Sequence, residues 1–284
     1  MATAVVSAPG KINLTLDILG RREDGYHDMK MVMQSITLAD RLTLRPGQTP
    51  GIQVSSSFHF LPTGEKNLAG KAAVCFYQAL GRPARDLDIA ITKHVPVCAG
   101  MAGGSSDAAA VLRALNQLEG SPFSAEELAH VGEGVGSDVP YCVLGCTALA
   151  QGRGERLTVL PALPMCWFVI VKPPVANSTA AMYRKLDEIS ISERPDSDKM
   201  VDALKNGDLA QVCRLVGNVF EQALPPDSEV FAIRRQLSEL GADAACMTGS
   251  GSAVMGLFCQ EETARLAARE LQKAYPLTFF APRL

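Results

Sequence analysis

Hydrophobic and polar residues alternate with a period of two along much of the first hundred residues, a pattern typical of half-buried strands. The alternation predicts strands over residues 3–8, 11–18, 30–45 and 86–93. Pro9-Gly10 separates the first two strands, and the break at Ala39-Asp40 predicts that the third range folds as a hairpin. Residues 46–66 are typical of a strand followed by a loop.

Helical spacing follows in the middle of the chain. Asn67 can cap a helix that runs to Leu80. A second helix ends at Gly120, and its apolar face consists of Val111, Leu112, Leu115 and Leu118. Ser124 and Glu127 have the spacing of a capping box and open a third helix. Beyond it, residues 132–140 are predicted to form a loop and residues 142–150 and 157–160 to form strands.

The pattern changes near residue 165, where helical stretches become more frequent. A strand is predicted over residues 167–171, and short strands over 244–248, 253–258 and 277–281. Helices are predicted over residues 178–188, 198–205, 208–223, 226–240 and 261–274. We therefore expect a domain boundary near residue 155, with one domain over residues 1–155 and another over residues 156–284.

Composition narrows the class of protein. The chain has 284 residues, a net charge of −3 and a pI near 5.9, which argues against a broad basic surface for nucleic acid. Its eight cysteines form no Cys-x-x-Cys pair and its four histidines are scattered, so a zinc site is not expected. The N-terminus has no secretory pattern, and the longest apolar run, residues 165–171, is too short to span a bilayer. We expect a cytoplasmic protein with reduced cysteines.

A glycine- and serine-rich loop leads directly into the second helix. It consists of Pro96, Val97, Cys98, Ala99, Gly100, Met101, Ala102, Gly103, Gly104, Ser105 and Ser106. Glycines allow positive φ and close approach to an anion, and the free N–H groups of a first helical turn point at it. The loop has neither the Lys-Ser/Thr ending of a Walker A motif nor the spacing of a dinucleotide fingerprint. Phosphate binding is modestly favoured over a structural turn.

Four further motifs have both a functional and a structural interpretation. Lys11 and Asn13 share one face of a strand, which is a candidate site or a solvated strand edge. Asp138, between Gly136-Ser137 and Val139-Pro140, is a candidate site residue, but most aspartates in such loops cap their own backbone. Tyr26-His27 ends a charged turn, where Tyr26 can simply cover an apolar edge. Gly249-Ser250 begins a second glycine-serine turn, which is a hairpin or another anion contact.

The order of these motifs resembles the superfamily of galactokinase, homoserine kinase, mevalonate kinase and phosphomevalonate kinase (GHMP kinases). Three segments narrow the resemblance to the 4-diphosphocytidyl-2-C-methyl-D-erythritol kinase family of the non-mevalonate isoprenoid pathway. They are Lys11-Ile12-Asn13-Leu14, residues 20–27 and Gly136-Ser137-Asp138-Val139-Pro140. The resemblance covers nearly the whole chain.

The resemblance implies a two-domain α+β fold with a cleft between an ATP-binding N-terminal domain, similar to ribosomal protein S5 domain 2, and a ferredoxin-like C-terminal domain on the substrate side. It implies an ATP-dependent kinase that phosphorylates the 2-hydroxyl of the cytidine diphosphate substrate. Lys11 and Asp138 would form the catalytic pair, and residues 96–106 would hold the ATP phosphates. The substrate would be bound by Asn13, Tyr26, His27, Tyr183, Gly249 and Ser250.

Those assignments agree with the chemistry of phosphoryl transfer. Asp138 can accept the proton of the attacking alcohol, and a neighbouring Lys11 ammonium would stabilise the charge of the phosphoryl group. Mg²⁺ is expected because it neutralises phosphate charge. Its ligands are not identified by the sequence, although Ser105 and Ser106 are available.

Two alternatives stay open at this point. One is a GHMP kinase with another acceptor, such as homoserine, a mevalonate-like acid or a sugar, but Tyr26-His27 favours an acceptor that contains a base. The other is a non-catalytic ligand-binding or RNA-binding relative, against which the acidic pI and the presence of Lys11 and Asp138 argue. We expect a small-molecule partner and neither nucleic acid nor membrane. The sequence is compatible with a monomer and with a homodimer.

Overall fold

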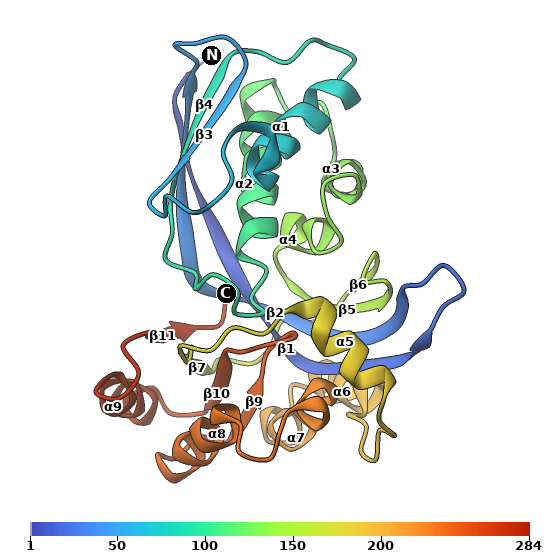
Figure 1. Ribbon diagram of the computed structural model, residues 1–284, viewed down its shortest axis with the longest axis vertical. Helices are drawn as coiled ribbons and strands as arrows, with labels where there is room; N and C mark the ends of the chain where they lie inside the picture. The colour runs from blue at the N-terminus through green and yellow to red at the C-terminus, as the bar shows by residue number, and fades with distance from the viewer. Residues whose placement is uncertain (1) are drawn as a thin grey trace. The chain divides into compact units, whose positions relative to one another are not determined.

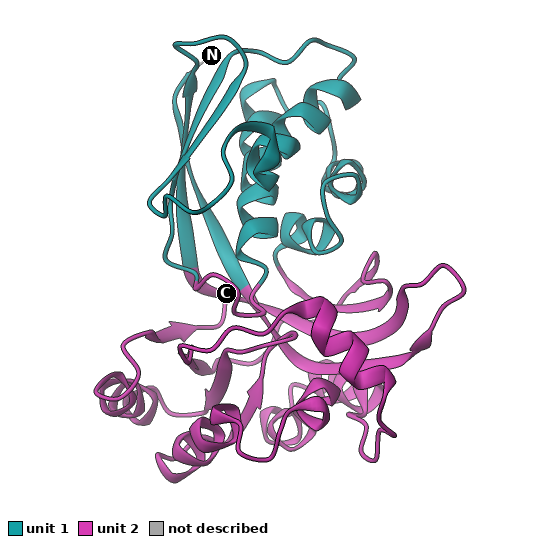
Figure 2. Ribbon diagram, in the orientation of Figure 1, with its two compact units in different colours: residues 1–10, 39–95, 102–145 teal, residues 11–38, 96–101, 146–284 magenta. Residues whose placement is uncertain are grey.

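A computed structural model describes residues 2–284 and divides into two compact units (Figure 2). Unit 1 comprises the chain through Gly10, Ala39–Val95 and Ala102–Gly145, and unit 2 comprises Lys11–Leu38, Pro96–Met101 and Cys146–Leu284. This division by contacts differs from a single boundary near residue 155, because two segments of the N-terminal half belong to unit 2. None of the helices in the described part of the chain is long and apolar enough to cross a membrane.

Two long strands replace the predicted series of short ones. Strand β1 (Ala4–Arg21) continues through Pro9-Gly10, since the fixed φ of proline is compatible with extended backbone. Strand β2 (His27–Pro46) is also continuous, so the hairpin predicted at Ala39-Asp40 is wrong (Figure 1). Asp40 is 1% exposed and accepts hydrogen bonds from the amides of His94 and Val95. The polar residue that looked like a turn is therefore a buried anchor.

Unit 1 combines a small group of strands with helices. Strand β4 (Leu87–Thr92) pairs antiparallel with residues 41–46 of β2 and parallel with β3 (Ile52–Ser56). The helices are α1 (Leu68–Ala79), α2 (Gly103–Leu118), α3 (Ala125–Glu133) and α4 (Val139–Leu144), with a 3₁₀ turn at Gly64–Lys66.

Local capping signals in unit 1 were predictable. The side chain of Asn67 accepts a hydrogen bond from the amide of Ala69, and Ser124 and Glu127 form the complete capping box. Helix α4, by contrast, begins inside a predicted loop, so the strand expected from residue 142 starts only at residue 147, in β5. A six-residue helix shows too little periodicity to be distinguished from a short apolar strand.

Unit 2 contains the rest of β1 and β2 and a separate four-stranded sheet. Strand β5 (Thr147–Gly152) pairs antiparallel with residues 29–34 of β2 and with β6 (Arg156–Val159), while β8 (Gly217–Asn218) pairs parallel with β1. The separate sheet has the order β11-β7-β10-β9 and is antiparallel throughout. In chain order this is 4-1-3-2, the ferredoxin-like arrangement. Its strands are β7 (Trp167–Val171), β9 (Ala244–Met247), β10 (Val254–Phe258) and β11 (Thr278–Pro282).

The remaining helices of unit 2 lie beyond strand β7 in the chain (Figure 1). They are α5 (Thr179–Asp187), α6 (Ser197–Lys205), α7 (Leu209–Leu215), α8 (Glu229–Glu239) and α9 (Glu261–Gln272). The helix predicted over residues 208–223 is interrupted after Leu215 by β8 and a 3₁₀ turn at Val219–Ala223. Asn218 causes the interruption, since its side chain caps the turn at the amide of Phe220. The α+β two-domain class is confirmed.

Candidate active site

The glycine-rich loop combines positive φ angles with a helix start. Cys98, Gly100 and Ala102 have φ of 53°, 75° and 54°, and α2 begins at Gly103. Gly103 and Gly104 are helical, so two non-glycine residues adopt the left-handed conformation that the sequence assigns to glycines. Each such residue costs about 1–2 kcal/mol, and strain of this kind is concentrated at ligand-binding sites. The loop is therefore not a relaxed turn.

The two glycine-rich turns meet within unit 2. A Cβ atom on Gly100 would lie 2.1 Å from the carbonyl oxygen of Thr248, and one on Gly249 would lie 2.5 Å from the carbonyl oxygen of Gly100. Both glycines also have positive φ. Only glycine permits this backbone contact. The turn at Gly249 joins the paired strands β9 and β10, as its hairpin interpretation predicts, and it also supports the loop.

Lys11 and Asn13 lie on the buried face of β1, with 5% and 1% of their surfaces exposed. The Nζ of Lys11 donates to Oδ1 of Asn13 at 2.6 Å, and that oxygen also accepts from the amide of Gly249 at 3.1 Å. The amide of Lys11 donates to the carbonyl of Met101, the last loop residue in unit 2. The solvated-edge interpretation is therefore wrong, and β1 presents a buried cation beside the loop.

Asp138 occupies the N-cap position of α4 in unit 1, with a half-buried side chain. Its carboxylate makes no capping hydrogen bond to the first turn of that helix. The turn-forming interpretation, in which the side chain binds its own backbone, therefore does not hold for α4. Lys11 and Asp138 belong to different units, so their convergence stays a prediction.

Two of the predicted substrate-binding aromatic residues stack on one another in unit 2. The ring centroids of His27 and Tyr183 are 4.6 Å apart and the ring planes are inclined by 24°. The rings of Tyr183 and Phe220 are nearly perpendicular, with centroids 5.0 Å apart. Asp187 contacts Nε2 of His27 at 2.8 Å. Tyr26 is 58% exposed, with the Arg153 guanidinium 4.9 Å above its ring. A flat base can stack on such rings.

The two loop serines are not equivalent. Ser106 is 1% exposed and donates its hydroxyl hydrogen to the carbonyl of Pro9 at 2.6 Å, which ties α2 to β1 within unit 1. Ser105 is more accessible and lies in the first turn of α2. Among residues 2–284, no three His, Cys, Asp or Glu side chains form a metal-binding group. Ser105 is the better candidate for a ligand near the phosphates.

Sequence reasoning missed the residues that fix these turns. The hydroxyl oxygen of Thr248 accepts a hydrogen bond from the amide of Asn13. The side-chain amide of Asn218 donates hydrogen bonds to the carbonyls of Met247 and Gly249. The hydroxyl of Ser250 forms a hydrogen bond with Thr179 at 2.8 Å. Thr248 directly precedes the recognised turn and was within reach of sequence reasoning. Asn218 lies in a segment with no recognisable motif, so nothing in the sequence signalled its role.

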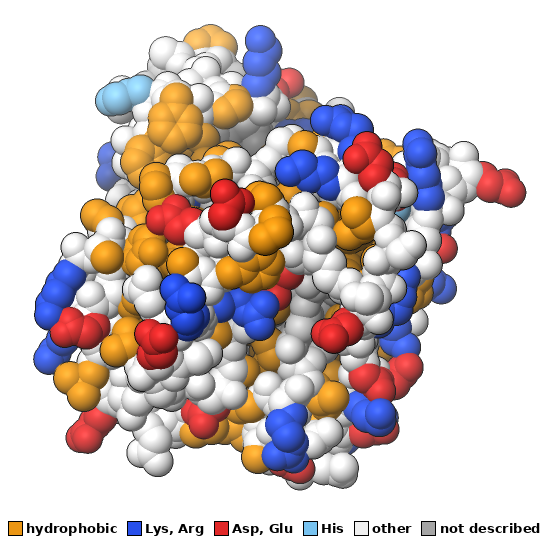
Figure 3. Space-filling model, turned by 60° about the horizontal axis from the view of Figure 1, so that its bottom comes forward, with side chains coloured by type: hydrophobic (Ala, Val, Ile, Leu, Met, Phe, Trp, Pro, Cys, Tyr) orange, Lys and Arg blue, Asp and Glu red, His pale blue; other side chains and the backbone are white. Residues whose placement is uncertain are grey.

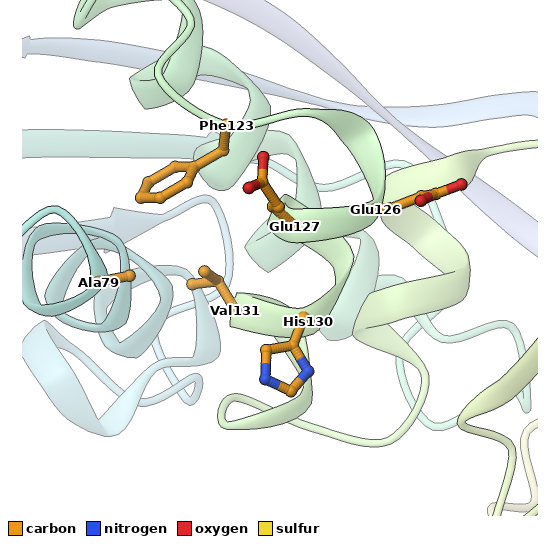
Figure 4. A pocket seen from close by; sticks show the side chains of 6 residues that line it. All are labelled: Ala79, Phe123, Glu126, Glu127, His130 and Val131. Atoms are coloured by element: carbon orange, nitrogen blue, oxygen red, sulfur yellow. The ribbon is translucent and has the colours of Figure 1, made fainter.

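A shallow hollow of about 450 Å³ in unit 1 contains none of the predicted site residues. It is lined by Ala79, Phe123, Glu126, Glu127, His130 and Val131 (Figure 4). The Glu127 carboxylate is engaged in the capping box, and His130 pairs with Glu133 on the same helix. The side chains of Glu127 and His130 therefore serve helix α3.

Charges of both signs are mixed on the face drawn in Figure 3, where Lys and Arg side chains lie among Asp and Glu side chains. No broad basic surface is present on that face. This distribution agrees with the net charge of −3.

Comparison with known proteins decides the family. Residues 67–146 match the GHMP kinases N terminal domain and residues 200–277 match the GHMP kinases C terminal domain. The 4-diphosphocytidyl-2-C-methyl-D-erythritol kinase of Geobacillus sp. (strain WCH70) is 48% identical over 256 residues, which cover 89% of this chain and 87% of that protein. The kinase of the same name from Exiguobacterium sibiricum is 45% identical and covers 93% and 92%. The chain belongs to this family of GHMP kinases. It is accordingly a phosphotransferase with an alcohol acceptor, and kinases of this superfamily depend on ATP.

Solved structures agree in fold. A crystal structure of 4-(cytidine 5'-diphospho)-2C-methyl-D-erythritol kinase has a TM-score of 0.81 and 32% identity, covering 99% of both chains. Homoserine kinase from Cytophaga hutchinsonii reaches a TM-score of 0.80 at 19% identity, covering 100% of this chain and 95% of that one. Because kinases for different acceptors are equally similar in backbone, the fold alone does not select the acceptor.

Proposed function

We propose that this kinase transfers the γ-phosphoryl group of ATP to the 2-hydroxyl of 4-diphosphocytidyl-2-C-methyl-D-erythritol. The observation that carries the proposal is the 48% identity to a kinase of that name over 89% of the chain. Identity at this level over nearly the full length supports this acceptor more strongly than the shared fold does. Three features of the site also support the proposal. They are the Asp138 carboxylate that does not cap its helix, the buried Lys11 ammonium group and the stacked rings of His27 and Tyr183.

The Asp138 carboxylate acts as the general base. It accepts the proton of the attacking hydroxyl while that oxygen bonds to the γ-phosphorus and the bond from phosphorus to the β-γ bridging oxygen breaks. A carboxylate that does not cap its own helix has its acceptor oxygens available for this role. Lys11, oriented by Asn13, stabilises the negative charge of the transferring group.

The phosphates of ATP bind along residues 96–106, where the amides of the first turn of α2 are available as donors. Mg²⁺, when bound, neutralises phosphate charge. A serine hydroxyl together with phosphate oxygens is an oxygen donor set of the kind that Mg²⁺ prefers, and Ser105 would supply the hydroxyl.

The cytosine base is recognised in unit 2 by Tyr26, His27 and Tyr183. Stacking on an aromatic ring contributes about 1–3 kcal/mol per base, and the His27 ring is held by Asp187. Asn13, Gly249 and Ser250 complete the acceptor side of the site. An acceptor without a base would gain nothing from these rings.

The test is an ADP-release assay with ATP, Mg²⁺ and four acceptors in parallel. We expect turnover with 4-diphosphocytidyl-2-C-methyl-D-erythritol, at least about 100-fold less kcat/KM with homoserine, mevalonate or galactose, and competition by CMP against the acceptor only. Preferred turnover of another acceptor would assign a different GHMP kinase. No ADP from any acceptor, with ATP still bound, would indicate a non-catalytic relative.

We place this activity in the cytoplasm, with a small-molecule partner. All eight cysteines are free thiols, which suits a reducing compartment. The mixed charge on the face shown in Figure 3 does not favour a nucleic-acid partner.

A further inference from the structure

A buried ion triad in unit 1 lies directly under the start of helix α2. Nζ of Lys93 contacts Oδ2 of Asp107 at 2.8 Å and also contacts Oδ2 of Asp40. The three side chains are 3%, 5% and 0% exposed, respectively. In such surroundings charge-assisted hydrogen bonds are strong and water does not screen them.

The triad joins the two segments that flank the glycine-rich loop. The Asp40 carboxylate accepts hydrogen bonds from the amides of His94 and Val95. These bonds fix the chain just before the loop. Asp107 lies one turn into α2, which fixes the chain just after it. Lys93 bridges the two carboxylates. The ends of the loop in unit 1 are thus tied to one ammonium group.

The same ammonium group lies against the first residue of the helix. A Cβ atom on Gly103 would be 3.2 Å from Nζ of Lys93 and 3.3 Å from Cγ1 of Val95. Gly103 is helical and has no need of positive φ, and a side chain there would have to displace Lys93 or Val95 by a few tenths of an ångström. The Lys93 ammonium group therefore packs against the first turn of the helix, whose N–H groups point away from the helix body.

The negative side of the triad is incompletely bonded. Oδ1 of Asp107 is buried and has no hydrogen-bond partner among the described residues. An unpaired buried carboxylate oxygen destabilises a fold unless another gain offsets it. Stability of the helix alone therefore does not account for the arrangement.

We infer that Lys93 is a positioning residue for ATP, held by Asp40 and Asp107 so that the first turn of α2 presents its amides to the phosphates. The inference rests on the proposed ATP site at this helix. Lys93 does not touch the reacting atoms in this scheme and acts through the turn at Gly103. It follows that binding of the phosphates depends on Lys93, whereas binding of the nucleoside does not.

The decisive variant is Lys93→Met combined with Asp107→Asn. It removes equal and opposite charges, nearly retains the side-chain shapes and leaves Asp40 bonded to its two amides. Lys93→Met alone would leave two buried carboxylates without a counter-ion and is expected to fold poorly. The matched control is Glu119→Gln, which changes a 4%-exposed carboxylate that pairs with Arg82 and Arg85 just beyond the other end of α2.

Equilibrium binding of ATP and of adenosine is measured at pH 8 without acceptor, alongside steady-state kinetics and the melting temperature. We expect the double variant to raise the Kd and KM for ATP at least about 10-fold, with the adenosine Kd, the acceptor KM and kcat within about threefold. Glu119→Gln is expected to change the ATP Kd by less than about twofold.

Three results would overturn the inference: an unchanged ATP Kd in the double variant, an equal loss of adenosine binding, or a double variant that does not fold while Glu119→Gln does. The last result would assign the triad to stability alone. The proposed function fails separately, because wild-type protein that binds ATP without phosphorylating the cytidine substrate would contradict the acceptor and leave this inference standing.

Discussion

At the scale of single residues, Asp138 combines the position of a helix cap with a carboxylate that does not cap. Asp208 provides a contrast, since it occupies the N-cap of α7 and accepts a hydrogen bond from the amide of Gln211. The two aspartates therefore occupy the same position relative to a helix, but only the carboxylate of Asp208 is hydrogen-bonded to the helix backbone. Capping therefore occupies a carboxylate oxygen of Asp208 and none of Asp138.

Replacing Asp138 by asparagine should separate catalysis from binding. The amide cannot accept the proton of the alcohol, so kcat should fall by about 10²–10⁴-fold, while the Kd for ATP stays within about threefold. Asp208→Asn is the control and should leave kcat within about twofold. Steady-state product assays measure kcat, and equilibrium binding measures the Kd for ATP. A parallel loss of ATP binding and melting temperature would assign Asp138 to structure.

Asp107 gives the fold a predictable pH dependence. Burial raises the pKa of its carboxyl group from 3.8 to about 7. The positive charge of Lys93 lowers this pKa and the negative charge of Asp40 raises it. Between pH 4 and pH 7 the folded protein binds more protons at this group than the unfolded chain, so its contribution to the free energy of unfolding falls as pH rises.

Asp107→Asn removes that titration. Relative to wild type, the free energy of unfolding of the variant should therefore increase by about 1–4 kcal/mol between pH 4.5 and pH 8. Urea unfolding at several pH values measures the difference. A difference between variant and wild type that is the same at both pH values would contradict the raised pKa.

At the scale of elements, local signals were readable in the sequence and long-range partners were not. The caps at Asn67 and Ser124 and the start of α2 depend on residues within a few positions of each other. The continuity of β2 depends on Asp40, whose partners His94 and Val95 come more than fifty positions later. A polar residue that finds a distant partner looks like a turn in the sequence.

The candidate site also contains features that the sequence predicts and features that appear only in the folded structure. Alternation along β1 correctly places Lys11 and Asn13 on one face, although it does not show that this face is buried. The contact of Gly100 with Gly249 joins two turns that the sequence presents as separate motifs. The residues that fix them, Asn218 and the Lys93 triad, carry no local pattern, because their roles exist only once the chain has folded.

At the scale of the whole molecule, each compact unit is assembled from separated parts of the chain. Residues 11–38 belong to unit 2, where β2 pairs with β5 and β1 pairs with β8. A cut after residue 155 would leave this segment, together with β2 and β5, on one fragment. Strands β6 and β8 and the four-stranded sheet would lie on the other. We therefore predict that the boundary near residue 155, which the change from strands to helices indicates, does not separate two parts that fold independently.

Expressed separately, fragments 1–155 and 156–284 should not give cooperative thermal transitions, because each would expose apolar strand surface that the other covers in unit 2. Co-expressed fragments should recover a transition and ATP-dependent turnover, since all pairings are then available. Calorimetry and circular dichroism of each fragment, alone and mixed, measure this. A cooperative transition in fragment 156–284 alone would show that the four-stranded sheet and its helices fold without residues 11–38, and that the strands of the N-terminal half are an addition to a self-sufficient domain.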